Sequence, residues 1–123
     1  QDRWEFKASM KNYYAWFGAV SFKNRIYVVG CNRCEVYNPE EDRWEDMTSP
    51  NDCGNGRNLI VFEDNLVLIG GSIQENKKWN GISTVQYYDF INRVWNTTKD
   101  MNIPHFHQSV AVINNYSPQP FNL

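Results

Sequence analysis

Three tryptophans recur at similar spacings, and this repetition constrains the fold more than any other feature of the chain. Trp4 and Trp44 are 40 residues apart, and Trp44 and Trp95 are 51 residues apart. Gly30 follows Trp4 by 26 residues, and Gly70 follows Trp44 by the same 26 residues. A period of about 40–50 residues is typical of solenoids and propellers, in which one unit cannot bury its apolar face alone.

Each repeat contains four short apolar segments separated by turn residues. The predicted strands of the two complete repeats are 16–22, 26–30, 34–38 and 43–46, then 57–63, 66–70, 84–89 and 94–97. Segments this short, with alternating β-formers and no helical period, favour antiparallel strands, and four of them make one propeller blade. We therefore predict an all-β fold with blades at 16–47 and 57–97.

The two ends of the chain are predicted to be parts of further repeats. Residues 1–15 carry Trp4 and are expected to end a preceding blade with a single strand. Residues 105–113 are expected to form one closing strand, and 114–123 a tail, because Pro118 stands where the next strand would begin. The predicted fold is thus a propeller fragment: two four-stranded antiparallel blades plus flanking single strands.

One loop differs in length between the repeats. The first repeat has only Asn32-Arg33 after the glycine position, whereas the second has residues 72–84. A constant frame with one variable loop predicts that the loop carries recognition. Trp79 lies in this polar loop without a repeat equivalent, so it is a candidate anchor for a partner. The alternative is that Trp79 folds back on its own blade.

The recurring residues resemble those of kelch repeats, most closely the BTB-kelch group. The second repeat has Gly70-Gly71 after an apolar strand, Tyr88-Asp89 in the third strand, and Trp95 seven residues after the tyrosine. The residues assigned to the repeat frame are Trp4, Trp44, Trp95, Gly30, Gly70, Gly71, Tyr37, Tyr88 and Asp89. Cys31 replaces the second glycine in the first repeat, so we expect that position to tolerate a side chain.

The resemblance implies a kelch-type propeller that binds proteins. It most directly implies the substrate-recognition part of an adaptor for a cullin-3 ubiquitin ligase, with cullin-3 bound through BTB domains outside this sequence. An actin-binding cytoskeletal scaffold is the alternative, and a secreted or oxidase-type kelch domain is a third. The loops of one rim are expected to hold the partner. Their candidate residues are Tyr13, Tyr14, Trp16, Asn32, Arg33, Asn55, Arg57, Gln74, Lys77, Trp79, His105 and Phe106.

Catalysis, cofactors and metals are not expected. The sequence has no phosphate-binding loop, no nucleophile elbow and no paired carboxylates outside the repeat frame. Cys31 and Cys34 have the spacing of metal ligands, but a zinc site needs four, and Cys53, His105 and His107 belong to other loops. We predict that both cysteines are small buried residues. Three cysteines, an odd number, indicate no disulfide framework and fit a reducing, cytoplasmic location.

Charge also limits the partners. The formal net charge is −2, without a basic stripe or an acidic tail, which argues against nucleic acid or an anionic membrane as the main partner. No apolar run approaches the length of about 18 residues that a membrane-spanning helix needs.

Overall fold

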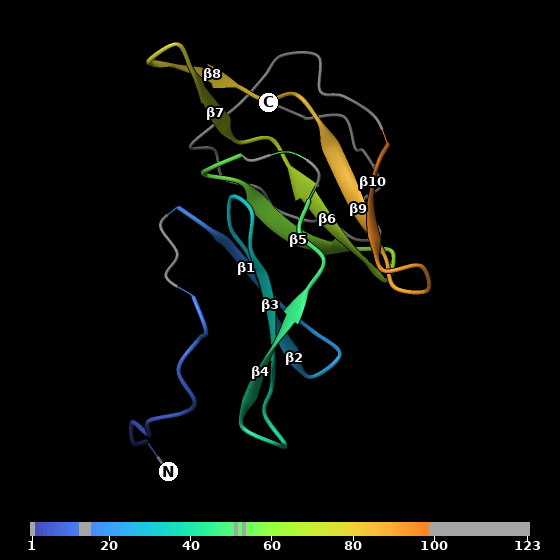
Figure 1. Cartoon of the computed structure of the whole chain (residues 1–123). Helices are drawn as coiled ribbons and strands as arrows, with labels where there is room; N and C mark the ends of the chain where they lie inside the picture. The colour runs from blue at the N-terminus through green and yellow to red at the C-terminus, as the bar shows by residue number, and fades with distance from the viewer. Residues whose placement is uncertain (1, 13–15, 51, 53, 99–123) are drawn as a thin grey trace, which may run out of the picture.

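The computed structural model describes residues 2–12, 16–50, 52 and 54–98, and the regular secondary structure of this part is entirely β. In chain order the strands are β1 (Gly18–Phe22), β2 (Arg25–Val29), β3 (Cys34–Asn38), β4 (Arg43–Met47), β5 (Asn58–Phe62), β6 (Asn65–Ile69), β7 (Ser72–Glu75), β8 (Lys78–Gly81), β9 (Val85–Asp89) and β10 (Val94–Thr97) (Figure 1). In the described residues, no helix has the length and apolar character needed to cross a membrane.

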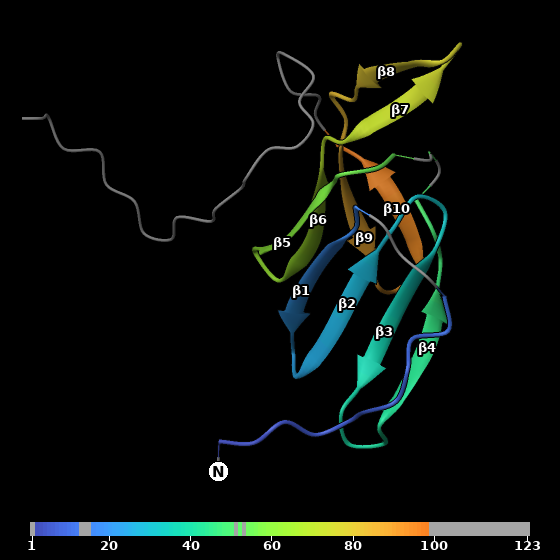
Figure 2. The same cartoon turned by 90° about the vertical axis from the view of Figure 1, so that its left-hand side faces the viewer.

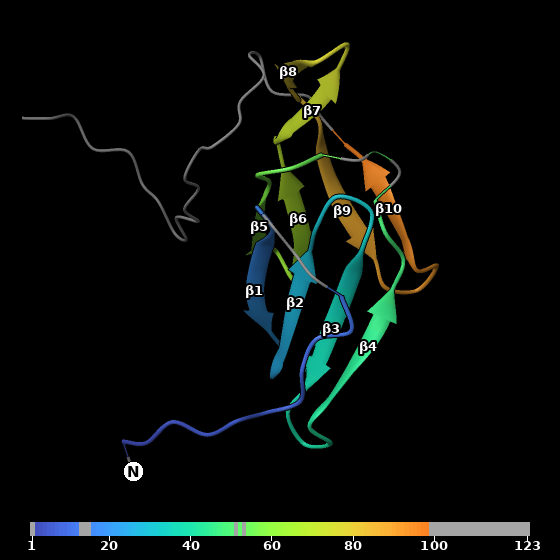
Figure 3. The ribbon, with the colours of Figure 1, turned by 60° about the vertical axis from the view of Figure 1, so that its left-hand side comes forward.

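The strands form two four-stranded antiparallel sheets, which we call blade 1 and blade 2. Blade 1 has the order β1-β2-β3-β4, and blade 2 has the order β5-β6-β9-β10. The two innermost strands, β1 and β5, are neighbours (Figures 2 and 3). The predicted all-β fold with two four-stranded antiparallel blades is confirmed.

Three hairpins use the same tight turn. Two residues join the strands in each, and both have positive φ: Lys23 and Asn24, Glu63 and Asp64, Asn76 and Lys77. Such turns match the right-handed twist of the flanking strands, and Asn and Asp adopt positive φ more readily than most residues.

The main apolar core lies between the two blades. It joins residues of blade 1, including Phe22, Val29 and Cys34, to Leu66 and Trp95 of blade 2. The innermost strands come together closely near Gly18, where an added Cβ would lie 3.0 Å from the backbone nitrogen of Leu59 and 3.0 Å from the carbonyl oxygen of Arg57. A side chain there would push the blades apart.

The recurring tryptophans bind one blade to the next. The indole Nε1 of Trp44 donates a hydrogen bond to the carbonyl oxygen of Ala8, at 2.8 Å. The indole of Trp95 donates in the same way to Thr48, also at 2.8 Å. Each acceptor lies four residues after the preceding tryptophan. The spacing of the tryptophans in the sequence therefore reflects a recurring hydrogen bond from each tryptophan to the segment that precedes its blade.

The third strand supplies a second contact that recurs between repeats. Glu35 of β3 is fully buried, and its Oε1 accepts a hydrogen bond from the backbone nitrogen of Lys11, at 2.8 Å. Gln86 holds the equivalent position in β9 and donates to Oδ1 of Asp52, at 2.9 Å. Asn12 and Asp52 are also equivalent, and Asn12 Nδ2 donates to Glu35 at 3.3 Å. Buried polar groups need such partners.

The Tyr-Asp motif of the third strand has a plain structural role. Tyr37 and Tyr88 pack on Trp44 and Trp95, with ring centroids 5.0 and 5.1 Å apart. Oδ1 of Asp89 accepts hydrogen bonds from two backbone nitrogens of the following turn, at 2.9 and 3.0 Å. The motif thus fixes the turn between the third and fourth strands of a blade.

The structure differs from the sequence-based expectations at the N-terminal flank and in the long loop. Residues 2–12, predicted to contain a single strand, carry no strand and run along blade 1, and Trp4 is 101% exposed rather than packed. The segment contacts blade 1 through side chains of that blade, such as Glu35 and Asp42, and forms no backbone ladder with any strand of the described residues. The segments predicted at 105–113 and 114–123 lie outside the described residues. The loop predicted at 72–84 is a second hairpin, β7–β8.

Candidate functional site

The loops at one end of the two blades form one rim of the fragment, which we call the Trp rim. It comprises residues 30–33, 54–57 and 70–84 together with Trp16. The opposite rim comprises the turns at 23–24, 39–42, 63–64 and 90–93. The β7–β8 hairpin projects from the Trp rim, beyond the ends of the blade strands (Figure 1).

The hairpin is an insertion into an otherwise constant frame. In blade 1 the backbone nitrogen of Gly30 donates to the carbonyl oxygen of Arg33, at 2.8 Å. In blade 2 the equivalent bond joins Gly70 to Thr84, at 3.1 Å. The same hydrogen bond therefore closes both loops, and the extra residues of blade 2 are free to extend beyond it.

Two exposed tryptophans from different blades meet on this rim. Trp16, which precedes β1, and Trp79, in β8, have ring centroids 6.1 Å apart and ring planes at 83°. Their exposed fractions are 62% and 45%. The structure thus brings together two sequence-predicted candidates that are 63 residues apart in the chain. Of the two readings of Trp79, folding back or remaining exposed, the structure shows a side chain that packs on Trp16 and keeps part of its surface open.

Backbone hydrogen bonds hold the two tryptophans in place. Gly56 donates its backbone nitrogen to the carbonyl oxygen of Trp16, at 2.8 Å. The adjacent Asn55 forms a two-bond bridge with Ser72, at 2.7 and 2.8 Å, and Ser72 begins the hairpin that carries Trp79. Trp16 has a φ of 54°, an uncommon conformation for a residue with a side chain. Strained backbone of this kind is often found at binding sites.

The remaining exposed groups of the hairpin are polar or charged. Gln74 lies directly opposite Trp79 in the ladder, so their side chains share one face of the hairpin. Lys77 is exposed in the turn, and Glu75 lies opposite Lys78. Amides, cations and large aromatic rings at an exposed site can bind a partner by hydrogen bonding, charge and packing.

Arg57 is used inside the protein rather than on its surface. Arg57 is 4% exposed, and its Nη2 lies 2.6 Å from Oδ2 of Asp52. Its Nε donates to the carbonyl oxygen of Gly70, at 3.1 Å. Burial alone would raise the pKa of Asp52, but hydrogen bonds from Arg57 and Gln86 and the Arg57 charge outweigh burial and lower this pKa. Arg57 was predicted as a partner-binding residue, and its side chain instead joins the loops of the Trp rim.

Gly71 corrects a second expectation. Cys31 at the equivalent position suggested that a side chain is tolerated there. In blade 2, however, Gly71 has a φ of 108°, and an added Cβ would lie 2.6 Å from Cγ of Arg57 and 2.9 Å from the carbonyl oxygen of Asn55. The buried arginine therefore requires glycine at this position, whereas Cys31 has no positive φ.

Asn32 and Arg33 occupy the short loop of blade 1. Arg33 donates to Oδ1 of Asn12, and Ser49 Oγ donates to the carbonyl oxygen of Asn32, at 2.9 Å. Together with Asp46 these residues line a hollow of about 400 Å³. The candidates Tyr13, Tyr14, His105 and Phe106 lie outside the described residues and stay predictions.

The cysteines differ from the expectation in one respect. Cys34 is a buried core residue with a free thiol, and burial raises the pKa of this thiol to about 12. Cys31, by contrast, is disulfide-bonded. Both cysteines were predicted to be small buried residues; this is confirmed for Cys34, whereas Cys31 is half-buried and takes part in a disulfide. Over the described ranges, no three His, Cys, Asp or Glu side chains gather in a way that could hold a metal ion.

Sequence comparison relates the chain to kelch-like proteins. Kelch-like protein 21 of Mus musculus is 30% identical over 103 residues, which cover 81% of this chain and 17% of that protein. Kelch-like protein 15 of Homo sapiens is 27% identical over 82 residues, covering 55% of this chain and 14% of that protein. The kelch-repeat, BTB-kelch-like relationship predicted from the motifs is confirmed, although no protein-family model matches the chain. The chain spans less than a fifth of the length of these curated relatives.

A solved structure confirms the fold independently. The structure entitled "Structure of YjhT" superposes with a TM-score of 0.77 and covers 88% of this chain and 34% of that chain. The sequences are 12% identical. The likeness therefore concerns the fold alone.

Proposed function

We propose that this chain is part of a kelch-repeat propeller that binds a protein partner through the Trp rim. The contact between Trp16 and Trp79 carries the proposal. Exposed tryptophans that are held in place by surrounding structure are typical energetic centres of protein interfaces. The opposite rim presents shorter turns and, within the described residues, has no comparable pair of tryptophans.

The rigidity of the rim also supports a binding role. Trp16 and Trp79 are linked through Gly56, the Asn55–Ser72 bridge and the hairpin ladder. Their positions are thus set before a partner arrives, which lowers the entropy lost on binding. Mobile loops with the same side chains would bind more weakly. The exposed side chains of the hairpin include an aromatic ring, amides and both acidic and basic groups, which suits a binding surface.

The finer proposal concerns the longer protein to which this chain is similar. We infer that the propeller recognises a ubiquitination substrate and that BTB domains outside this sequence join it to cullin-3 in the cytoplasm. The similarity to kelch-like proteins 21 and 15 supports this assignment. Binding to actin is the alternative. Co-precipitation of cullin-3 with the full-length protein tests the cullin-3 assignment. Co-sedimentation with actin filaments, without cullin-3 in the precipitate, contradicts it.

An alanine scan of the full-length protein tests the Trp rim itself. Partners are first captured from cell lysate with the wild-type protein and identified, and affinities are then measured for single variants. We expect Trp79→Ala and Trp16→Ala each to weaken binding by about 1–3 kcal/mol, because each removes an aromatic anchor. Lys77→Ala should have a smaller effect, through a slower association rate.

Ile91→Ala is the matched control, because Ile91 is 92% exposed at the tip of a turn on the opposite rim. It should leave affinity unchanged. Thermal unfolding of each variant separates lost binding from lost folding. If Ile91→Ala weakens the complex while both tryptophan variants bind normally, the partner uses the opposite rim and the proposal is wrong.

A further inference from the structure

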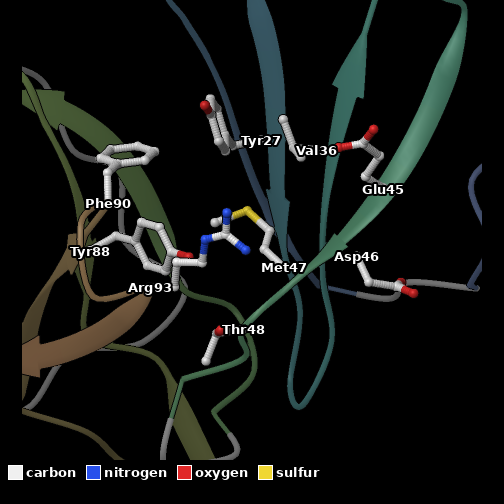
Figure 4. A pocket seen from close by; sticks show the side chains of 9 residues that line it. All are labelled: Tyr27, Val36, Glu45, Asp46, Met47, Thr48, Tyr88, Phe90 and Arg93. Atoms are coloured by element: carbon white, nitrogen blue, oxygen red, sulfur yellow. The ribbon is translucent and has the colours of Figure 1, made fainter.

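A pocket lies between the two blades, away from the Trp rim. One of the residues that line it, Arg93, has the opposite charge to Asp42, the residue at the equivalent position of blade 1. The volume of the pocket is about 390 Å³, within the range of small-ligand sites. Tyr27 and Met47 of blade 1 line one side, and Tyr88, Phe90 and Arg93 of blade 2 line the other (Figure 4). The Arg93 side chain extends into the space between Tyr88 and Met47 (Figure 4).

The equivalent position at the preceding boundary is closed by a carboxylate. Arg93 and Asp42 each lie two residues before the tryptophan of their blade, and both have positive φ. Oδ1 of Asp42 accepts hydrogen bonds from the backbone nitrogen of Ala8, at 2.8 Å, and from the hydroxyl of Tyr37, at 2.5 Å. One carboxylate thus joins the tyrosine of blade 1 to the segment that precedes it.

The boundary between blades 1 and 2 keeps the tyrosine but lacks this carboxylate. Thr48 replaces Ala8, Tyr88 replaces Tyr37, and Arg93 replaces Asp42. Arginine has no acceptor, so it cannot make either hydrogen bond that Asp42 makes. Tyr88 instead hydrogen-bonds Thr48. The repeat therefore leaves a place for a carboxylate and positions a guanidinium next to it.

Arg93 is the group of this pocket that favours an anion. Glu45 and Asp46 also line the pocket, but both already have cationic partners: Glu45 shares Arg43 with Glu41, at 2.5 and 2.7 Å, and Asp46 pairs with Lys11 at 3.3 Å. Within the part of the chain that the structure describes, no carboxylate forms an ion pair with Arg93. Guanidinium groups bind carboxylates strongly through paired hydrogen bonds.

We propose that this inter-blade pocket binds an extended segment of a partner protein in which Asp or Glu adjoins an apolar residue. The carboxylate of the segment pairs with Arg93, in the role that Asp42 plays at the preceding boundary. The adjoining apolar side chain lies against the exposed ring of Phe90, which packs on Tyr27 and Tyr88. This site is separate from the Trp rim, and the proposal does not depend on the function assigned to that rim.

Two short peptides test the proposal on the full-length protein. The probes are N-acetyl-Phe-Glu-amide and N-acetyl-Phe-Gln-amide, titrated at low salt with saturation-transfer NMR. We expect the glutamate peptide to bind about 5–10-fold more tightly, because a charge-assisted hydrogen bond is about twice as strong as a neutral one. Equal affinities for the two peptides would overturn the proposal.

Three variants locate the effect. Arg93→Gln should abolish the preference for glutamate. Arg93→Asp should also abolish it while leaving the unfolding temperature unchanged or higher, because the new carboxylate restores the group found at position 42. Trp79→Ala, which alters only the Trp rim, should retain the preference. A preference that survives Arg93→Gln, or one that disappears in Trp79→Ala, places carboxylate recognition elsewhere and refutes the assignment.

Discussion

The residues around the buried guanidinium of Arg57 are the most strongly constrained in this protein. The Arg57 side chain is 1% exposed and pairs with Asp52 while donating to the carbonyl oxygen of Gly70. Its position in turn fills the space above Gly71. One arginine thus explains why position 71 is a glycine.

The first prediction concerns these glycines. Gly71→Ala should lower the free energy of unfolding by about 1–3 kcal/mol, since φ is positive and the new Cβ meets the carbonyl oxygen of Asn55. Gly70→Ala, at a φ of 65°, meets strain without that contact and should cost about 1 kcal/mol. Denaturant unfolding of both variants is the measurement. A Gly71→Ala variant as stable as wild type would show that Arg57 moves aside easily.

The second prediction concerns pH. The pKa of Asp52 is lowered in the folded protein, so its contribution to stability is complete above the unfolded pKa, about 3.9 for aspartate. That contribution is lost as pH falls through the folded pKa. Asp52→Asn should therefore reduce stability at pH 7 and flatten the stability profile below about pH 4. Thermal melts between pH 2 and 7 test this, and parallel profiles for variant and wild type would contradict it.

Among the secondary-structure elements, the fourth strand joins each blade to the one before. The indoles of Trp44 and Trp95 donate to backbone carbonyls across the two boundaries. Trp95 is 3% exposed because blade 1 covers it, whereas Trp44 is only partly buried because residues 2–12 cover it less fully. The same hydrogen bond therefore lies in two different environments.

The third prediction follows from this contrast. Trp95→Phe should destabilise the protein by about 1–3 kcal/mol, because it removes the hydrogen bond to the carbonyl oxygen of Thr48 and reduces the packing volume of a buried side chain. Trp44→Phe should cost less in this chain. Unfolding of the two variants under the same conditions gives the comparison. A larger loss for Trp44→Phe would mean that residues 2–12 hold blade 1 together more firmly than blade 2 does.

The β7–β8 hairpin gives a fourth prediction. Replacing residues 72–84 by Asn-Arg keeps Gly71 and gives the closing hydrogen bond of Gly70 the form found in blade 1. The loss of the Asn55–Ser72 bridge should cost about 1–2 kcal/mol, the value of two hydrogen bonds. Blade 2 should still fold, as monitored by circular dichroism and thermal unfolding. Failure of the shortened chain to fold would show that the hairpin is part of the blade's stability.

Over the whole molecule, apolar surface is covered at the boundary between the blades and open at the outer flanks. Phe22 is 9% exposed because Phe90 of blade 2 lies 6.0 Å away. Phe62 holds the equivalent position in blade 2 and is 45% exposed. Trp4 and Phe6 are fully exposed as well. These side chains lie where neighbouring repeats of a propeller would pack.

The fifth prediction is that a polypeptide of this sequence alone self-associates. Exposed aromatic side chains and sheet edges without partners favour association between copies. Size-exclusion chromatography with light scattering should show oligomers, and the combined change Trp4→Ser and Phe6→Ser should reduce them. A monomer with slow amide exchange throughout both blades would show that two repeats are stable by themselves.

The sequence alone determined the blades, because their signals are local and repeated. Tyr37 and Tyr88 recur seven residues before tryptophan, and alternating short strands between turn residues specify antiparallel hairpins. Because the same pattern of strands and turns occurs in both repeats, the strand limits were predicted to within one or two residues. The β7–β8 hairpin was missed, because it has no counterpart in the first repeat and its strands, Ser72–Glu75 and Lys78–Gly81, are mostly polar.

Only the tertiary structure decided which loop residues act together. Trp16 and Trp79 come from different blades, and their contact depends on how the blades are oriented and on backbone bonds through Asn55 and Ser72. The burial of Arg57 depends likewise on Asp52 and Gly70, which come from separate loops. Strand periodicity depends on residues that are neighbours in the chain, so it can be recognised in the sequence. Contacts between loops are set by packing in three dimensions, so sequence spacing could nominate their members but could not pair them.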